Sequence, residues 1–150
     1  MTVEFGYWMS SEEHSPKALV HNAVRAEELG FRHAMISDHF HPWVTKQGNS
    51  PFVWSVLGAI AVRTEQLRVG TGVTASLVRI HPAITAHAAA TVAAMMPGRF
   101  LLGMGTGERL NEHVTGEKWP TIGERQSMLE EYVDVIRRLW TGEEVTFRGT

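Results

Sequence analysis

The spacing of apolar, strand-like segments constrains the fold of this chain most strongly. Such segments begin near positions 3, 33, 67 and 100, and a helical pattern follows each of them. Alternation of strands and helices at this spacing predicts a parallel sheet with right-handed crossover connections. Two α/β architectures fit this pattern: an open doubly wound sheet, or half of an eight-fold barrel. A complete barrel needs about 250 residues, so the barrel alternative predicts that the chain is the first half of a longer protein.

Local signals set the expected boundaries of these segments. Ser15-Pro16 and Ser50-Pro51 each place a serine that can cap a helix before a proline that favours the first helical turn. Gly30 and Gly142 are expected helix ends. A short extra strand or hairpin arm is expected at 145–147. The expected strands are 3–8, 33–37, 67–73 and a segment from 100 onward, and the expected helices are 16–30, 52–63, 82–96 and 121–142.

Composition excludes several classes of function. The net charge of −2 gives no electrostatic reason to expect nucleic acid or an anionic membrane as a partner. The chain contains no cysteine, which excludes disulfides, zinc thiolate sites and cysteine nucleophiles and permits the cytoplasmic location that we expect. The sequence shows no secretory signal and no apolar run long enough to span a bilayer.

Polar residues follow each expected strand, and these positions are the candidates for a site. In α/β proteins with parallel strands, ligands bind beyond the carboxyl ends of the strands. A histidine can take a proton near neutral pH and a glutamic acid can give one, so His39 and Glu108 are complementary candidates for acid–base chemistry. The strand-end residues are Trp8 and Ser10 after the first strand, Asp38, His39 and Trp43 after the second, 72–76 after the third, and Gly107, Glu108 and Asn111 after the fourth.

Each candidate also has a purely structural interpretation. His39 can be a hydrogen-bonded polar group at a strand end, Glu108 a helix N-terminal residue favoured by the helix dipole, and Trp43 a loop residue that covers the barrel. The glycines of 103–107 resemble a dinucleotide-binding fingerprint, but its third glycine falls at Glu108, where a carboxylate would repel a pyrophosphate. The remaining histidines lack the spacing of metal ligands, and no metal site is expected.

Several motifs taken together strongly resemble the deazaflavin (coenzyme F420)-dependent oxidoreductases of the luciferase-like superfamily. The group that matches best is the one typified by F420-dependent glucose-6-phosphate dehydrogenase. The resemblance implies a (β/α)8 TIM barrel of which residues 1–150 are the N-terminal half, with only the first four βα units. It further implies F420 at the carboxyl ends of the strands, a small-molecule substrate and a homodimer. The motifs are 37–43 (SDHFHPW), 50–52 (SPF), 70–73 (GTGV), 81–83 (HPA) and 103–112 (GMGTGERLNE).

The resemblance also assigns roles to individual residues. By this likeness His39 is the base that takes a proton from the substrate hydroxyl as hydride leaves for the deazaflavin, Glu108 is the acid near its N1, and Trp43 borders the reacting centre. Gly72-Val73 corresponds to a non-proline cis peptide behind the cofactor ring. The cofactor-binding residues implied by the resemblance are Asp38, Gly72, Val73, Ala75, Gly107, Glu108 and Asn111.

Two residues depart from the pattern of the glucose-6-phosphate enzymes. A serine is usual where Gly72 stands, and a threonine is usual where Ala75 stands. The sequence therefore predicts an F420-dependent oxidoreductase that acts on an alcohol or sugar-type substrate, without identifying that substrate. Two alternatives stay open: an FMN-dependent monooxygenase of the same superfamily, and an inactive barrel fragment that serves only as a structural module.

Overall fold

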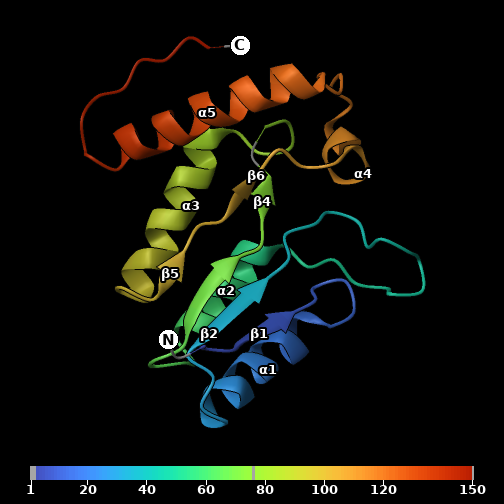
Figure 1. Cartoon of the computed structure of the whole chain (residues 1–150), viewed down its shortest axis with the longest axis vertical. Coiled ribbons are helices and arrows are strands. Elements are labelled where there is room, and N and C mark those ends of the chain that lie inside the picture. The colour runs from blue at the N-terminus through green and yellow to red at the C-terminus, as the bar shows by residue number, and fades with distance from the viewer. Residues whose placement is uncertain (1–2, 76, 150) are drawn as a thin grey trace.

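A parallel sheet forms the centre of the molecule (Figure 1). The structure is a computed structural model that describes residues 3–75 and 77–149; Ser76, the last residue of the third expected strand-end loop, lies outside them. Within the described residues, the four-stranded sheet has the order β1-β2-β3-β5, and every neighbouring pair is parallel. The strands are β1 (Gly6–Met9), β2 (His33–Ile36), β3 (Arg68–Thr71) and β5 (Phe100–Leu101).

The third and fourth expected strands are each interrupted. β4 (Thr74–Ala75) follows β3, and β6 (Met104–Gly105) follows β5, and the two short strands pair with each other in parallel. The Gly72–Val73 peptide bond between β3 and β4 is cis, as the resemblance implied. The expected continuous strand at 67–73 is therefore shorter in the structure, and a second small sheet lies beyond the carboxyl end of the first.

The helices begin largely where the sequence predicted. The Ser15 hydroxyl accepts a hydrogen bond from the Ala18 N–H at the start of α1, and Thr121 forms a capping box with Glu124 at the start of α5. The prediction that Ser50-Pro51 starts a helix was wrong, because α2 begins later, with Phe52 at its N-cap position and no side-chain cap. The helices are α1 (Pro16–Glu28), α2 (Val53–Ala61), α3 (Pro82–Met95), α4 (Arg109–Glu112), the 3-10 turn η1 (His113–Thr115) and α5 (Ile122–Leu139).

Three further differences concern the second half of the chain. α4 and η1 were not among the expected helices, since a helix this short leaves no periodic apolar pattern in the sequence. The structural interpretation of Glu108 as a helix N-terminal residue did point to this place, because Glu108 is the N-cap residue of α4. α5 ends at Leu139, before the expected stop at Gly142, and Trp140 is its C-cap residue. The arm expected at 145–147 forms no strand, because no neighbouring strand lies beside it in the described part of the chain.

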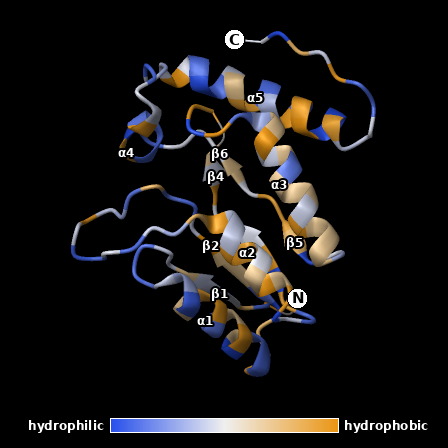
Figure 2. Ribbon diagram, turned by 180° about the vertical axis from the view of Figure 1, so that it is seen from behind, coloured by the Kyte–Doolittle hydropathy of each residue, from blue (hydrophilic) through white to orange (hydrophobic). Residues whose placement is uncertain are grey.

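The packing of the helices decides between the two architectures that the sequence left open. α1 packs against α2, α2 against α3, and α3 against α5, so these longer helices are neighbours in the order in which they follow along the chain. A doubly wound sheet would instead place helices on both of its faces. The buried core lies between the sheet and these helices, and Figure 2 shows apolar residues along the strands and along α2 and α3. Fully buried members of this core include Met9, Leu19, Ile36, Leu57, Ile60 and Val69.

The opposite face of the sheet corresponds to the inside of a barrel. Trp8 and Met35 point to this face, where an added Cβ at Gly70 would lie 2.8 Å from the Met35 sulfur and one at Gly72 would lie 2.6 Å from the Trp8 ring. Among the described residues, no strand pairs with the outer edge of β1 or of β5. This arrangement is that of consecutive βα units from a barrel. None of the described helices combines the length and the apolar character needed to cross a lipid bilayer.

Candidate functional site

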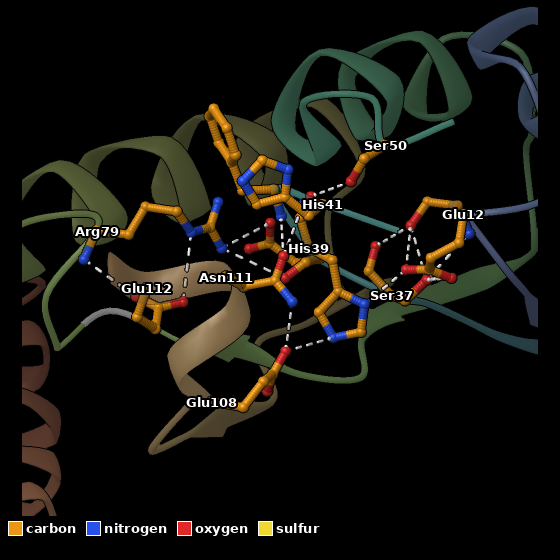
Figure 3. Close-up of polar contacts among 12 residues, drawn as sticks. Glu12, Ser37, His39, His41, Ser50, Arg79, Glu108, Asn111 and Glu112 are labelled. Atoms are coloured by element: carbon orange, nitrogen blue, oxygen red, sulfur yellow. Dashed lines mark hydrogen bonds and ion pairs between the residues drawn. The ribbon is translucent and has the colours of Figure 1, made fainter. Parts of the chain in front are cut away.

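Loops that follow β1, β2, β4 and β6 meet beyond the carboxyl end of the sheet (Figure 3). The segment after β1 supplies Glu12, and the segment after β2 supplies His39. The segment after β6 supplies Glu108 at the N-cap position of α4. The structure therefore brings together the histidine and the glutamate that the sequence proposed as an acid–base pair, and it adds a second carboxylate that the sequence did not reveal.

His39 lies between these two carboxylates. Its Nδ1 is 2.6 Å from Glu12 Oε1, and its Nε2 is 3.3 Å from Glu108 Oε1. The imidazole side chain is 16% exposed, whereas that of Glu12 is 4% exposed and that of Glu108 is 36% exposed. Glu12 is thus the interior partner of the histidine, and Glu108 is the partner that faces solvent.

Hydrogen bonds to Glu12 keep its carboxylate ionised although it is buried. Burial by itself raises the pKa of Glu12, but hydrogen bonds from His39, Ser37 and Ser10 outweigh it and lower the pKa to about 2. The hydroxyls of Ser10 and Ser37 each donate to Glu12 Oε2 at 2.9 Å. Sequence reasoning missed Glu12, although its position shortly after the first strand, at the same edge as the other candidates, was a usable signal.

The ionised Glu12 fixes which nitrogen of His39 carries the proton. A carboxylate can only accept, so Nδ1 must donate to it, and the neutral imidazole then has its lone pair on Nε2. Burial lowers the pKa of His39, but the hydrogen bond to Glu12 and the negative charges of Glu12, Glu108 and Asp38 raise it more, so the net shift is upward. Nε2 is therefore a proton acceptor of increased basicity that faces Glu108.

Asn111 sets the position of Glu108 relative to the histidine loop. The Asn111 side chain is buried, and its Oδ1 accepts hydrogen bonds from the backbone N–H groups of Phe40 at 2.7 Å and His41 at 2.6 Å. Its Nδ2 donates to Glu108 Oε1 at 2.5 Å. Asn111, which the sequence named as a cofactor contact, thus ties the loop after β2 to the start of α4.

An exposed tryptophan borders the acid–base pair, and an exposed valine stands at the cis peptide. The Trp43 ring lies edge-on to His39, with the ring centroids 5.0 Å apart and the planes inclined by 77°. Trp43 is 54% exposed, and Val73 at the cis peptide is 44% exposed. The structure therefore places a tryptophan next to the candidate base and an exposed aliphatic side chain shortly after the end of β3. Their roles at a cofactor stay predictions.

Other proposed site residues are packed inside the protein. The Asp38 carboxylate is buried and accepts hydrogen bonds from Arg79 Nη2 at 3.2 Å and Thr74 Oγ1 at 2.8 Å. Ala75 is also buried, and an added Cβ at Gly107 would lie only 2.9 Å from it. Asp38 is therefore held by Arg79 and Thr74, and Ala75 by close packing against Gly107. Their contacts with a cofactor stay predictions.

Comparison with known proteins identifies the family. A sequence model described as luciferase-like monooxygenase matches residues 1–150. The chain belongs to this family. It is similar to the F420-dependent glucose-6-phosphate dehydrogenases of Intrasporangium calvum, at 46% identity over 98% of this chain, and Kribbella flavida, at 45% identity over 99% of it. The chain spans 45% of the length of each of these relatives.

Solved structures of similar proteins share the fold. An F420-dependent secondary alcohol dehydrogenase, solved with an F420–acetone adduct, superposes with a TM-score of 0.93 at 40% identity, covering 99% of this chain and 46% of that one. The F420-dependent tetrahydromethanopterin reductase of Methanopyrus kandleri superposes with a TM-score of 0.80 at 28% identity, covering 99% of this chain and 43% of that one. The comparisons confirm the resemblance inferred from the motifs and the expected fold class, part of a luciferase-like α/β barrel.

We expect Glu12→Gln to lower the pKa of His39. The glutamine keeps a hydrogen-bond acceptor for Nδ1 but removes the charge that stabilises the imidazolium, so the proton leaves His39 at lower pH. Titration of the His39 ring signals by NMR measures the change. Glu13→Gln is the matched control, because Glu13 is adjacent but exposed and is not among the groups that shift His39. An unchanged His39 pKa in Glu12→Gln would contradict this assignment.

We also expect Gly107→Ala to destabilise the protein more than Gly116→Ala. Both glycines have positive φ, 71° and 81°, so alanine at either position costs about 1–2 kcal/mol of backbone strain. Only at Gly107 would the added Cβ crowd neighbours, at 2.8 Å from Glu112 Cγ, which adds about 1–3 kcal/mol. Chemical denaturation followed by circular dichroism measures both free energies of unfolding. Equal losses would show that the packing around Gly107 adapts freely.

Proposed function

We propose that this chain is the N-terminal half of a single (β/α)8 barrel domain whose complete form is an F420-dependent oxidoreductase. In this proposal the enzyme transfers hydride between F420 and an alcohol or sugar-type substrate. The observation that supports it most is the arrangement of His39, whose Nδ1 donates to the ionised Glu12 while its Nε2 faces Glu108. The similarity to named F420-dependent enzymes over the whole chain supports the choice of cofactor.

The chemistry of the strand-end surface fits a flat cofactor ring. Val73 and Trp43 expose apolar side chains there, and Glu108 is partly exposed close to His39. A planar ring needs an apolar surface for its face and hydrogen-bonding groups for its polar edge. When bound, the deazaflavin supplies the hydride acceptor or donor. In this proposal Val73 supports the ring, Glu108 and Asn111 lie at its polar edge, and Gly72 and Gly107 allow the close packing of the loops.

The groups of this chain then divide the proton chemistry between them. During alcohol oxidation, His39 Nε2 accepts the proton of the substrate hydroxyl, and Glu12 stabilises the positive charge that forms on the imidazole. Glu108, which faces solvent, takes up a proton there and passes it on at the cofactor side, and Trp43 contacts the reacting centre from the edge of His39. Because the base must be neutral, the rate of oxidation is expected to rise as the pH increases through the raised pKa of His39.

The substrate class rests on what the similar enzymes have in common. The curated relatives are named as dehydrogenases of glucose-6-phosphate, and the solved neighbour as a dehydrogenase of a secondary alcohol. Both names describe oxidation of a carbon that carries a hydroxyl group, which is the step that a histidine base assists. An FMN-containing neighbour, a Baeyer–Villiger monooxygenase, is 22% identical and indicates only a common fold.

Titration with F420 and with FMN tests the cofactor assignment. Fluorescence quenching of each cofactor by the complete protein is expected to show tighter binding of F420, by about tenfold or more. Tighter binding of FMN would support the monooxygenase alternative. A folded protein that binds neither cofactor would support a purely structural module.

Substitution of the proposed base tests the mechanism. His39→Ala is expected to lower kcat about 100-fold or more, since general bases typically contribute at least that factor, while the affinity for F420 changes little. His33→Ala is the control, because His33 lies at the amino end of β2, where it pairs with Glu4 and is remote from the site. Parallel loss of kcat and F420 affinity in His39→Ala would indicate a structural role.

The homodimer and the cytoplasmic location expected from the sequence stay predictions. Light scattering of the purified protein gives the mass in solution and separates a dimer from a monomer.

A further inference from the structure

Arg79 is a buried cation that takes no part in the acid–base chemistry described above. Its side chain is 7% exposed and lies between two carboxylates (Figure 3). Nη2 donates to Asp38 Oδ1 at 3.2 Å and to the Asp38 carbonyl oxygen at 3.3 Å, and Nε donates to Glu112 Oε1 at 3.4 Å. The backbone N–H of Arg79 donates to Glu112 Oε2 at 3.0 Å. A single residue thus holds two segments that are far apart in the sequence.

The Asp38 end of this cluster reaches the region of the cis peptide. The second carboxylate oxygen of Asp38 accepts a hydrogen bond from Thr74 Oγ1, and both side chains are buried. Thr74 begins β4, directly after the cis Gly72–Val73 bond. Because Asp38 directly precedes His39, the contact fixes the histidine loop relative to the exposed Val73.

The Glu112 end of the cluster is connected to Glu108, the proposed acid. Glu112 is buried in α4, next to Asn111, which binds the backbone N–H groups of Phe40 and His41 and also donates to Glu108. The contacts therefore form a closed circuit. It runs from the loop after β2 through Arg79 to α4, and returns through Asn111 to the loop after β2.

We propose that Arg79 is a positioning residue that, together with Asp38 and Glu112, holds His39, Val73 and Glu108 in the arrangement needed to bind the cofactor. Its expected effect on cofactor binding rests on the proposed function, whereas its effect on the loops does not. Asp38 and Glu112 act in this scheme through the contacts of their buried carboxylates with Arg79.

The chemistry of the cluster accounts for the presence of arginine. A guanidinium is a planar group with several N–H donors in fixed directions, so it can bind two carboxylates at once, whereas the ammonium of lysine is a single compact charge. Buried ion clusters contribute little net stability because each charge loses its hydration. Burial in fact raises the pKa of Glu112 in spite of the neighbouring Arg79. Geometry is therefore a better explanation for the cluster than stability.

Arg99 provides a matched control for this proposal. Its guanidinium also joins separate segments, donating to the Thr64 hydroxyl at 3.1 Å and to the carbonyl oxygens of Leu67 at 3.1 Å and Thr64 at 3.0 Å. These contacts lie at the amino end of the sheet, just before β3 and β5. Arg79→Met and Arg99→Met therefore each remove an arginine that joins loops, at opposite ends of the same strands.

Hydrogen–deuterium exchange of the cofactor-free complete protein gives the first readout. Arg79→Met is expected to increase hydrogen exchange about tenfold in two segments, 38–43 and 109–113. In the first segment, the N–H groups of Phe40 and His41 bond to Asn111, whose position depends on the Arg79 contacts. Arg99→Met is expected to increase exchange in 61–68 and to leave 38–43 unchanged. Unchanged exchange at 38–43 in Arg79→Met, or equal increases at both ends of the sheet, would overturn the proposal.

The affinity for F420 gives the second readout. Arg79→Met is expected to weaken F420 binding about tenfold or more relative to Arg99→Met, and Arg79→Lys is expected to recover only part of the loss. If the unmodified protein binds no F420, but Arg79→Met still shows faster hydrogen exchange in 38–43 and 109–113, the proposed function fails and the positioning role stands. If the unmodified protein binds F420 and both methionine variants bind it equally well, the positioning role fails.

Glu112→Gln keeps the experiment decisive if Arg79→Met does not fold. Glutamine preserves the volume and one acceptor oxygen but removes the charge opposite Arg79. Faster exchange at 109–113 together with weaker F420 binding would support the circuit. Unchanged values of both would overturn it.

Discussion

The hydrogen bond between Glu12 and the Nδ1 of His39 is the interaction on which the candidate site depends. It joins the segment after β1 to the loop after β2, and it exists in this form because Glu12 stays ionised inside the protein. The ionised carboxylate determines the tautomer of the imidazole and directs the Nε2 lone pair toward Glu108. Without the Glu12 carboxylate, this contact would no longer fix the tautomer of His39.

A second layer of buried polar groups supports this arrangement. Asn111 and the Arg79 cluster bind backbone and side-chain groups of three loops, so that the loops at the carboxyl end of the sheet form one connected unit. Such groups are costly to bury, and they are retained where precise geometry is required. In the barrel architecture the sheet and helices form the stable core, while the loops carry the chemistry.

Local features of the sequence predicted the architecture well, but they predicted the contacts between residues of the site only in part. The strand spacing gave the parallel α/β order, and Ser15 and Thr121 marked true helix starts. Ser50 was misread as a cap, because its hydroxyl instead donates to the His39 carbonyl oxygen across a loop. The motifs indicated His39 and Glu108, but Glu12, Arg79 and Glu112 went unnoticed, since a charged residue in a sequence is normally interpreted as a surface residue.

The sequence by itself determined the order of strands and helices, the family and the candidate acid–base pair, because these follow from periodicity, short-range caps and contiguous motifs. The tertiary structure alone decided which residues meet at the carboxyl end of the sheet and which charge states they hold. Glu12 and His39 are 27 positions apart, and Arg79 and Glu112 are 33 apart. The protonation of Glu12, His39 and Glu112 depends on burial and on partners from other loops, and neither exists until the chain has folded.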